Sequence, residues 1–106
     1  MLELTTTTDG PAHTIVIAGE LDHQTTSRLH EALTGLSLGS GDHLAIDLAR
    51  LTFCDSSGLS TFLVARELTV DAGATLDLVA QPRMLTRMLR TTGLTEVFTI
   101  RDQAVR

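Results

Sequence analysis

The stretch Phe53-Cys54-Asp55-Ser56-Ser57-Gly58-Leu59 joins a predicted strand, Leu44–Leu48, to a helical pattern that runs to about Asp71. It sets a small hydroxyl at the start of a helix, with an acid before it and a glycine close behind. A helix N-terminus carries unpaired N–H groups and partial positive charge, so it accepts anions readily. We therefore interpret this stretch as the site of a serine that can hold a phosphate without disturbing the core.

The same residues also fit a purely structural role. Asp55 or either serine could cap the helix, and Gly58 could simply allow tight packing. Cys54, beside an aromatic residue, is predicted to be a small buried residue rather than a reactive thiol. The local pattern leaves capping and modification open, so the rest of the chain has to decide between them.

Hydrophobic periodicity and turn residues predict eight elements in the order ββαβαβαβ. Asp9-Gly10-Pro11 is strong turn chemistry and predicts a hairpin of the first two strands. The predicted strands are residues 2–8, 13–18, 44–48, 75–79 and 97–100. The predicted helices are residues 24–36, 59–71 and 83–91, with a possible short helical tail over 101–106. The inner stripe expected for the second helix is Leu59, Phe62, Leu63 and Val70, interrupted by Arg66.

The strand patterns predict where the helices lie. The strands at 44–48 and 75–79 each have one polar side, unlike strands of a sheet that is covered on both faces. Right-handed crossovers between neighbouring strands would place the helices on one face. We therefore expect a single α/β domain over residues 1–106, with a mixed sheet of about five strands and helices packed on one face.

The charge of the chain is unevenly distributed. The formal net charge is −5. Residues 1–80 hold eleven acids against three arginines, whereas residues 81–106 hold five arginines against two acids. An acidic body disfavours direct nucleic-acid binding, which depends on phosphate neutralisation. With a single cysteine and no apolar run long enough for a membrane span, we expect a cytoplasmic protein that does not bind membranes.

Two side-chain groups outside the serine stretch allow alternative interpretations. Arg83, Arg87 and Arg90 form a basic stripe, which is either a solvated face or a surface that meets an acidic kinase or phosphatase. Val64 and Leu68 lie off the inner stripe of the second helix, so they either pack under a neighbouring helix or form an exposed apolar patch.

No enzymatic site or cofactor is predicted. A serine hydrolase would need a Gly-x-Ser-x-Gly elbow, a base and an orienting acid, and the serine stretch lacks the leading glycine. The glycines do not match a Walker loop or a dinucleotide fingerprint. The chain has four histidines without metal-ligand spacing, namely His13, His23, His30 and His43. We therefore expect a non-enzymatic protein with no cofactor and no metal.

Two segments resemble one family. Gly19-Glu20-Leu21-Asp22-His23-Gln24-Thr25 resembles the first loop of STAS-domain anti-sigma factor antagonists, and Leu51–Leu59 resembles their phosphorylation loop. An Asp-Ser-Ser-Gly tetrapeptide alone is a weak signal, but the second segment and the order of elements extend the resemblance to nearly the whole chain. The sequence departs from the family at Ser60, where glycine is common.

The resemblance implies a STAS-like fold and a partner-switching function. In this family the unphosphorylated antagonist binds an anti-sigma factor that is also a serine kinase, and so frees the sigma factor. The kinase phosphorylates the serine after the aspartate, and a PP2C-type phosphatase removes the phosphate. Carried over, Ser56 is the phosphoacceptor and Ser57 a lesser candidate. The implied partner-binding residues are Glu20, Asp22, His23, Asp55, Ser56, Ser57, Gly58 and Leu59. The alternative is a STAS interaction module of another signalling or transport complex.

Overall fold

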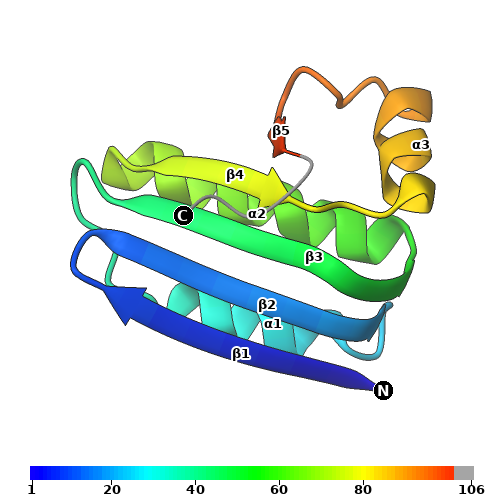
Figure 1. Ribbon diagram of the computed structural model, residues 1–106, viewed down its shortest axis with the longest axis horizontal. Coiled ribbons are helices and arrows are strands. Elements are labelled where there is room, and N and C mark those ends of the chain that lie inside the picture. The colour runs from blue at the N-terminus through cyan, green and yellow to red at the C-terminus, as the bar shows by residue number, and fades with distance from the viewer. Residues whose placement is uncertain (102–106) are drawn as a thin grey trace.

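The computed structural model describes residues 1–101, which form a five-stranded sheet with the strand order β1-β2-β3-β4-β5 (Figure 1). β1 pairs antiparallel with β2, and every later neighbour pairs in parallel. The strands are β1 (Leu2–Asp9), β2 (Ala12–Leu21), β3 (His43–Cys54), β4 (Thr75–Val79) and β5 (Thr99–Arg101). The helices are α1 (Thr26–Thr34), α2 (Ser56–Ala72) and α3 (Arg83–Thr91). The predicted order and the mixed sheet are confirmed; the proposed tail lies, from residue 102 on, outside the described residues.

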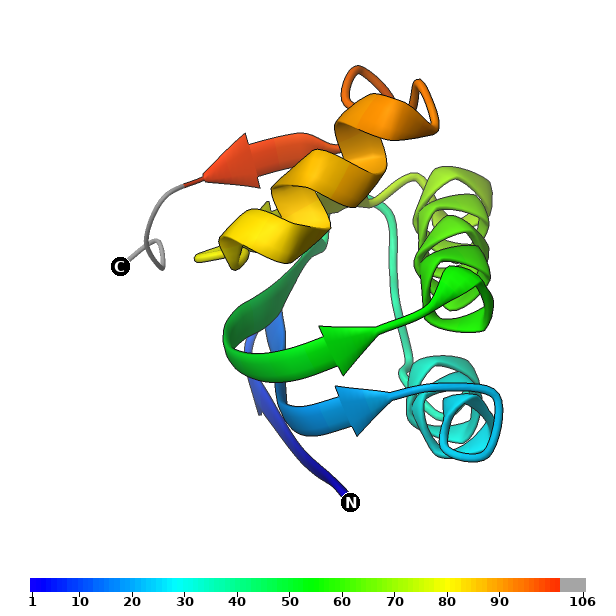
Figure 2. The ribbon, with the colours of Figure 1, turned by 90° about the vertical axis from the view of Figure 1, so that its right-hand side faces the viewer.

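α1 and α2 lie side by side against one face of the sheet, and α3 lies at the carboxyl end of β4 (Figures 1 and 2). The opposite face carries no helix in the part of the chain that the structure describes. Alternate residues of β2 and β3 turn into the layer between the sheet and these helices. The fully buried members of that core include Ile15, Ile17, Leu29, Leu44, Ile46, Leu48 and Phe62. The prediction that helices pack on one face of the sheet is therefore confirmed for α1 and α2.

The buried side of α2 differs from the prediction. Leu59 and Phe62 are buried as expected, but Val70 is 60% exposed. Thr61 and Thr69 are buried in place of the apolar residues that the pattern favoured. Their hydroxyls donate to carbonyls one turn back, at 3.0 and 2.8 Å, which satisfies them inside the core. Arg66, expected to interrupt the inner stripe, is exposed.

Val64 and Leu68 of α2, for which the sequence allowed two interpretations, are both half-buried. Leu68 packs against the core and lines a shallow hollow together with Leu33 and Leu36 from the α1 region. For Leu68, packing beside the neighbouring helix is therefore the correct alternative.

β2 and β3 continue past their predicted ends. β2 extends through Leu21, past its predicted end at residue 18, and β3 extends to Cys54, past its predicted end at residue 48. The pairing of the two strands shifts register twice, between Val16 and Ala18 and between Gly19 and Glu20. Each shift breaks the alternation of inward and outward side chains. The hydrophobic pattern of the sequence therefore no longer indicates a strand there, although the two strands remain paired. As a result, both family-like motifs begin on strand ends.

The amino ends of β2, β3 and β4 form a polar cluster, which we call the amino pole: His13, Asp42, His43 and Asp77. His13 is 4% exposed, and its ring nitrogens lie 3.1 Å from Thr8 Oγ1 and 2.9 Å from Asp42 Oδ2. His43 Nε2 lies 3.2 Å from Asp77 Oδ2. The Gly39 N–H, and then His13, hold the pKa of Asp42 below its usual value. Internal partners therefore engage the polar groups of this pole.

Candidate functional site

The two family-like segments are neighbours in space. In the parallel pairing of β2 and β3, Glu20 lies opposite Phe53 and Leu21 opposite Cys54. The Asp55 N–H donates to the Leu21 carbonyl at 3.2 Å, which ties the two strand exits together. Both motifs therefore lie at one end of the sheet. We call this surface, with residues 20–23 and 53–57, the loop pole.

Asp55 caps α2. Its backbone is extended, and its Oδ1 accepts hydrogen bonds from the N–H groups of Ser57 and Gly58 at 3.0 and 3.1 Å. Ser57 Oγ also donates to the same oxygen. This hydroxyl is the main cause of the lowered pKa of Asp55, with help from the N–H groups of Gly58, Ser57 and His23. The cap role predicted as one alternative is present, and Asp55 carries a negative charge at neutral pH.

The hydroxyl groups of Ser56, Ser57 and Ser60 differ in their hydrogen-bond partners. Ser57 is half-buried and its hydroxyl is engaged by Asp55, whereas Ser60 Oγ donates to the Ser56 carbonyl at 3.0 Å. Ser56 is the first residue of α2 and is exposed, and within residues 1–101 its hydroxyl has no hydrogen-bond partner. Its Oγ is thus the accessible hydroxyl of the motif, placed where a helix start favours an anion.

Gly58 explains why the loop can approach the sheet so closely. A Cβ at this position would stand 2.7 Å from Cys54 Sγ and 3.0 Å from Leu21 side-chain carbons. Any side chain would therefore push α2 away from both strand exits. Burial, and then Asp55, raises the pKa of Cys54 to about 12, which fits the prediction of a buried, unreactive residue.

The other predicted contact residues divide into exposed and internal groups. Asp22 is half-buried, and its Oδ1 accepts from the N–H groups of Gln24 and Thr25 at 3.0 and 3.1 Å. It therefore caps its own turn, one of the roles open to a loop acid. Glu20 and His23 are exposed, with Glu20 Oε1 3.0 Å from the Met1 amino group.

Leu59 and Gly58 are buried, so neither presents a side chain to a partner. They can contribute to binding only by holding the loop pole in place. Sequence reasoning also missed Phe53, which is 48% exposed beside Glu20. Counted from the buried Leu44, Ile46 and Leu48, it falls on the outward side of β3, but it lies beyond residue 48, where the strand was predicted to end. An exposed aromatic ring at this edge is suited to protein contact.

Residues 1–101 contain neither a cluster suited to a metal ion nor a helix suited to crossing a membrane. No group of three or more histidine, cysteine, aspartate or glutamate side chains there is arranged to hold a metal ion. None of the helices in that range combines the length and apolar character that a membrane crossing needs.

Comparison with known sequences identifies the family. A STAS domain family, described as Mlab, STAS domain, matches residues 4–101. The anti-sigma-B factor antagonist of Listeria monocytogenes is 32% identical over 88 residues, which cover 83% of this chain and 77% of the relative. The chain belongs to the STAS-domain anti-sigma factor antagonist family. The predicted resemblance, drawn from the two loop-pole segments, is therefore confirmed.

Solved structures share the fold of this STAS domain. An anti-sigma factor antagonist from Mycobacterium paratuberculosis has a TM-score of 0.78 and 22% identity, covering 95% of this chain and 86% of that one. A sulfate transporter family protein from Wolinella succinogenes reaches 0.77 at 17% identity, covering 92% and 81%. The phosphorylated form of the Bacillus cell fate determinant SpoIIAA reaches 0.68 at 22% identity, covering 94% and 90%. At these identities the likeness concerns the fold alone.

Proposed function

We propose that this STAS domain is an anti-sigma factor antagonist whose unphosphorylated form binds an anti-sigma factor with serine kinase activity and so releases a sigma factor. Phosphorylation of Ser56 switches this binding off, and a PP2C-type phosphatase restores it, in the cytoplasm. The observation that carries the proposal is the exposed Ser56 hydroxyl at the start of α2, without a hydrogen-bond partner in residues 1–101. The Listeria antagonist, whose sequence this chain matches at 32% identity, supports the partner class.

The loop pole is suited to binding the unphosphorylated state. Its exposed members include the Phe53 ring, the Glu20 carboxylate and the His23 imidazole, on strand ends fixed by Gly58 and the Asp55 cap. Such a surface offers one aromatic anchor surrounded by polar groups, as protein interfaces commonly do. We therefore assign Glu20, His23, Phe53 and Ser56 to direct partner contact, and Asp22, Asp55, Ser57, Gly58 and Leu59 to holding the surface in shape.

The phosphate is expected to act through charge. It adds about −1.5 to −2 charges at neutral pH, next to the already ionised Asp55. If a partner carboxylate lies about 5 Å away, each unit charge costs roughly 3 kcal/mol at an effective dielectric near 20. Since about 1.4 kcal/mol is tenfold in affinity, the phosphorylated form is expected to bind ~100-fold more weakly or worse. The domain itself should keep its fold, because a helix start tolerates an anion.

Site-specific phosphorylation tests the proposal. The chain is incubated with the anti-sigma factor kinase of its own organism and ATP, and the modified residue is located by mass spectrometry. The wild-type chain and the Ser57→Ala and Ser60→Ala variants should each gain one phosphate, on Ser56. Ser56→Ala should gain none but should still bind the kinase. Modification of Ser57 in the wild-type chain, or loss of binding by Ser56→Ala, would contradict the assignment.

A second candidate is an interaction module of a transport complex or another signalling complex. The TM-score of the sulfate transporter family structure nearly equals that of the Mycobacterium paratuberculosis anti-sigma factor antagonist, so the fold does not separate the two functions. The Ser56 hydroxyl, which has no partner in residues 1–101, favours the function of an antagonist that is switched by phosphorylation. If affinity capture from native cells recovers a transporter and no anti-sigma factor, the second candidate replaces the first.

A further inference from the structure

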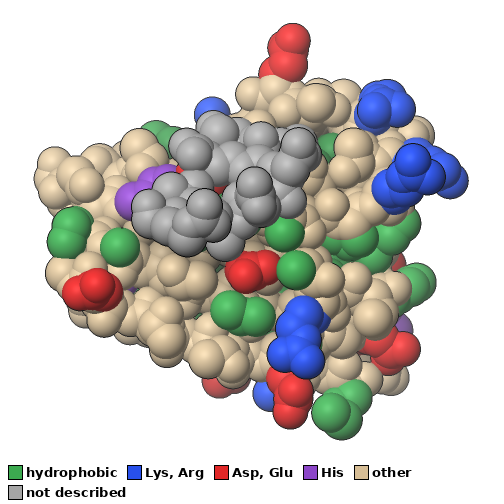
Figure 3. All heavy atoms as spheres, in the orientation of Figure 1, with side chains coloured by type: hydrophobic (Ala, Val, Ile, Leu, Met, Phe, Trp, Pro, Cys, Tyr) green, Lys and Arg blue, Asp and Glu red, His purple; other side chains and the backbone are tan. Residues whose placement is uncertain are grey.

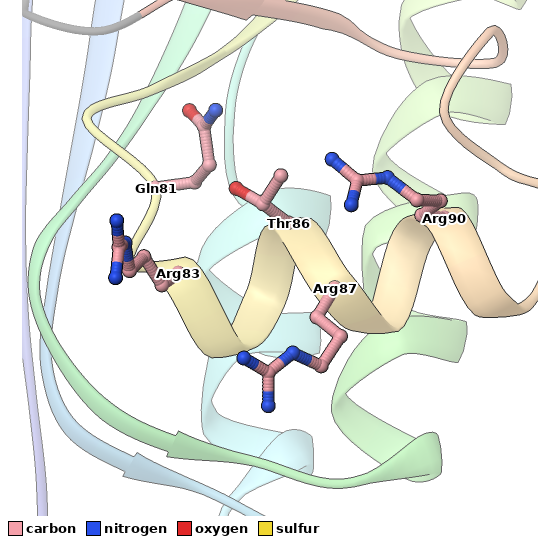
Figure 4. A pocket seen from close by; sticks show the side chains of 5 residues that line it. All are labelled: Gln81, Arg83, Thr86, Arg87 and Arg90. Atoms are coloured by element: carbon pink, nitrogen blue, oxygen red, sulfur yellow. The ribbon is translucent and has the colours of Figure 1, made fainter.

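The outer face of α3 carries an unusual concentration of positive charge. Arg83, Arg87 and Arg90 line a concave surface that encloses about 480 Å³, together with Gln81 and Thr86, and none of the lining residues within 1–101 is acidic. Their guanidinium groups spread along the whole length of the helix (Figure 4). In Figure 3, basic side chains gather at the upper right of the molecule, over α3. We call this surface the arginine face.

This charge has no internal partner to explain it. Within residues 1–101, none of the three α3 arginines takes part in an ion pair or a side-chain hydrogen bond. Arg83 is the first residue of α3 and lies at the positive end of the helix dipole, where an acid would be preferred. Arg87 follows one turn later, and like charges at this spacing repel. Arg90, in the last turn, suits the helix dipole, but the placement of Arg83 and Arg87 weakens α3. Charges that cost helix stability and have no partner in residues 1–101 favour a role in binding.

The arginine face lies at the same end of the sheet as the loop pole. β3 and β4 are parallel, so α3, which follows the carboxyl end of β4, projects from the end where β3 leads into Ser56 (Figure 1). The loop pole is acidic, with Glu20, Asp22 and Asp55, whereas α3 is basic. One end of the molecule therefore presents two regions of opposite charge.

From these observations we infer that the arginine face is a second part of the docking surface and binds an acidic segment of the anti-sigma factor. This inference rests on the proposed function. An acidic segment would be repelled by the acidic body of the domain and attracted only by α3, so the contact would fix the orientation in which the partner meets Ser56. Arginine forks suit carboxylates, with which they form paired hydrogen bonds.

Charge reversal on α3 tests the inference. The variant Arg83→Glu/Arg87→Glu is compared with the wild-type chain in binding the anti-sigma factor, at several salt concentrations. Glutamate at position 83 suits the helix dipole, and glutamates at 83 and 87 keep the like-charge spacing of the wild-type arginines, so α3 should remain folded, which circular dichroism checks. Each lost ion pair is expected to weaken binding about 1.5- to 5-fold, and reversal adds repulsion, so we expect a loss of about tenfold or more. The association rate should fall most, and the dependence of affinity on salt should flatten.

The matched control is Arg66→Glu on α2, an exposed arginine that does not line the concave surface. It changes the net charge in the same sense and should alter affinity by no more than about twofold. Equal binding by the α3 variant and the wild-type chain would overturn this inference and leave the proposed function intact. If the wild-type chain itself binds no anti-sigma factor, the proposed function fails first. Tight, saturable binding of pyrophosphate to the domain alone, with partner affinity unchanged by charge reversal, would replace the inference with a small-anion site.

Discussion

The amino pole and the loop pole lie at opposite ends of the same parallel strands. At the amino pole, the buried His13 contacts a partner with each ring nitrogen, and Asp42 binds both His13 and the Gly39 N–H. At the loop pole, Asp55 caps α2, yet the Ser56 hydroxyl beside it has no partner in residues 1–101 and Phe53 is half exposed. Aspartates shape both ends, but only the loop pole leaves groups available to another molecule. Substitutions at the two poles should therefore separate stability from binding.

The largest effect of a substitution is expected at Gly58, because this residue contributes to both stability and partner binding. Gly58→Ala would force a Cβ to within 2.7 Å of Cys54 Sγ, so α2 must shift away from the strand exits. We expect a loss of about 1–3 kcal/mol in the free energy of unfolding, together with weaker partner binding. Urea unfolding and a binding titration measure the two effects. In the control Gly39→Ala, the new Cβ makes only ordinary contacts, and a cost above about 0.5 kcal/mol there would weaken the comparison.

His13 should affect stability alone. His13→Ala removes a partner from both Asp42 and Thr8 in a buried setting, so we expect a loss of about 1–3 kcal/mol in the free energy of unfolding. Partner affinity, measured at a temperature where the variant is folded, should stay within about twofold of wild type. A large loss of affinity in the folded variant would show that the two poles are coupled.

The two neighbouring serines provide the sharpest contrast within one pole. Ser57→Ala removes the hydroxyl that binds Asp55 and should cost about 0.5–1.5 kcal/mol of stability. Ser56→Ala removes a hydroxyl without a partner in the described residues and should change stability by less than about 0.5 kcal/mol. Thermal melts of both variants, run side by side, check the order. If Ser56→Ala proves the more destabilising, Ser56 has a structural role that our description of the loop pole misses.

Acid should weaken both poles gradually. Asp55 and Asp42 have folded-state pKa values below 3.8, so each stabilises the fold fully above that pH. That contribution is lost as the pH falls through their folded-state pKa values. Melting temperatures measured from pH 6 to pH 2 should therefore fall at the acidic end, and less steeply in Asp55→Asn. An identical pH profile for this variant would show that the Asp55 carboxylate does not contribute as its hydrogen bonds indicate.

Much of this architecture could be predicted from sequence because it follows local rules. The turn at Asp9-Gly10-Pro11, the alternation in residues 44–48 and the bounds of β4 and α3 all follow from residue types at regular spacing. The paired loop motifs could also be placed at one sheet end, because parallel strands bring their carboxyl ends together.

The rest depended on tertiary geometry that no local pattern carries. The continuation of β3 past residue 48 hid the exposure of Phe53, and back-bonded hydroxyls hid the burial of Thr61 and Thr69. The difference between Ser56 and Ser57 depends on which hydroxyl reaches Asp55; the family resemblance favours Ser56, but the local pattern allows either serine. Function in this domain therefore depends on details of hydrogen bonding that residue types alone do not determine.

One titration tests the central claim most directly. The anti-sigma factor is titrated calorimetrically into the unmodified chain and into the same chain carrying one phosphate on Ser56, with melting curves recorded for both. We predict an affinity lower by ~100-fold or more for the phosphorylated chain, with similar melting temperatures. Equal affinities, or a phosphorylated chain that has lost its folded structure, would contradict a switch based on charge at the start of α2.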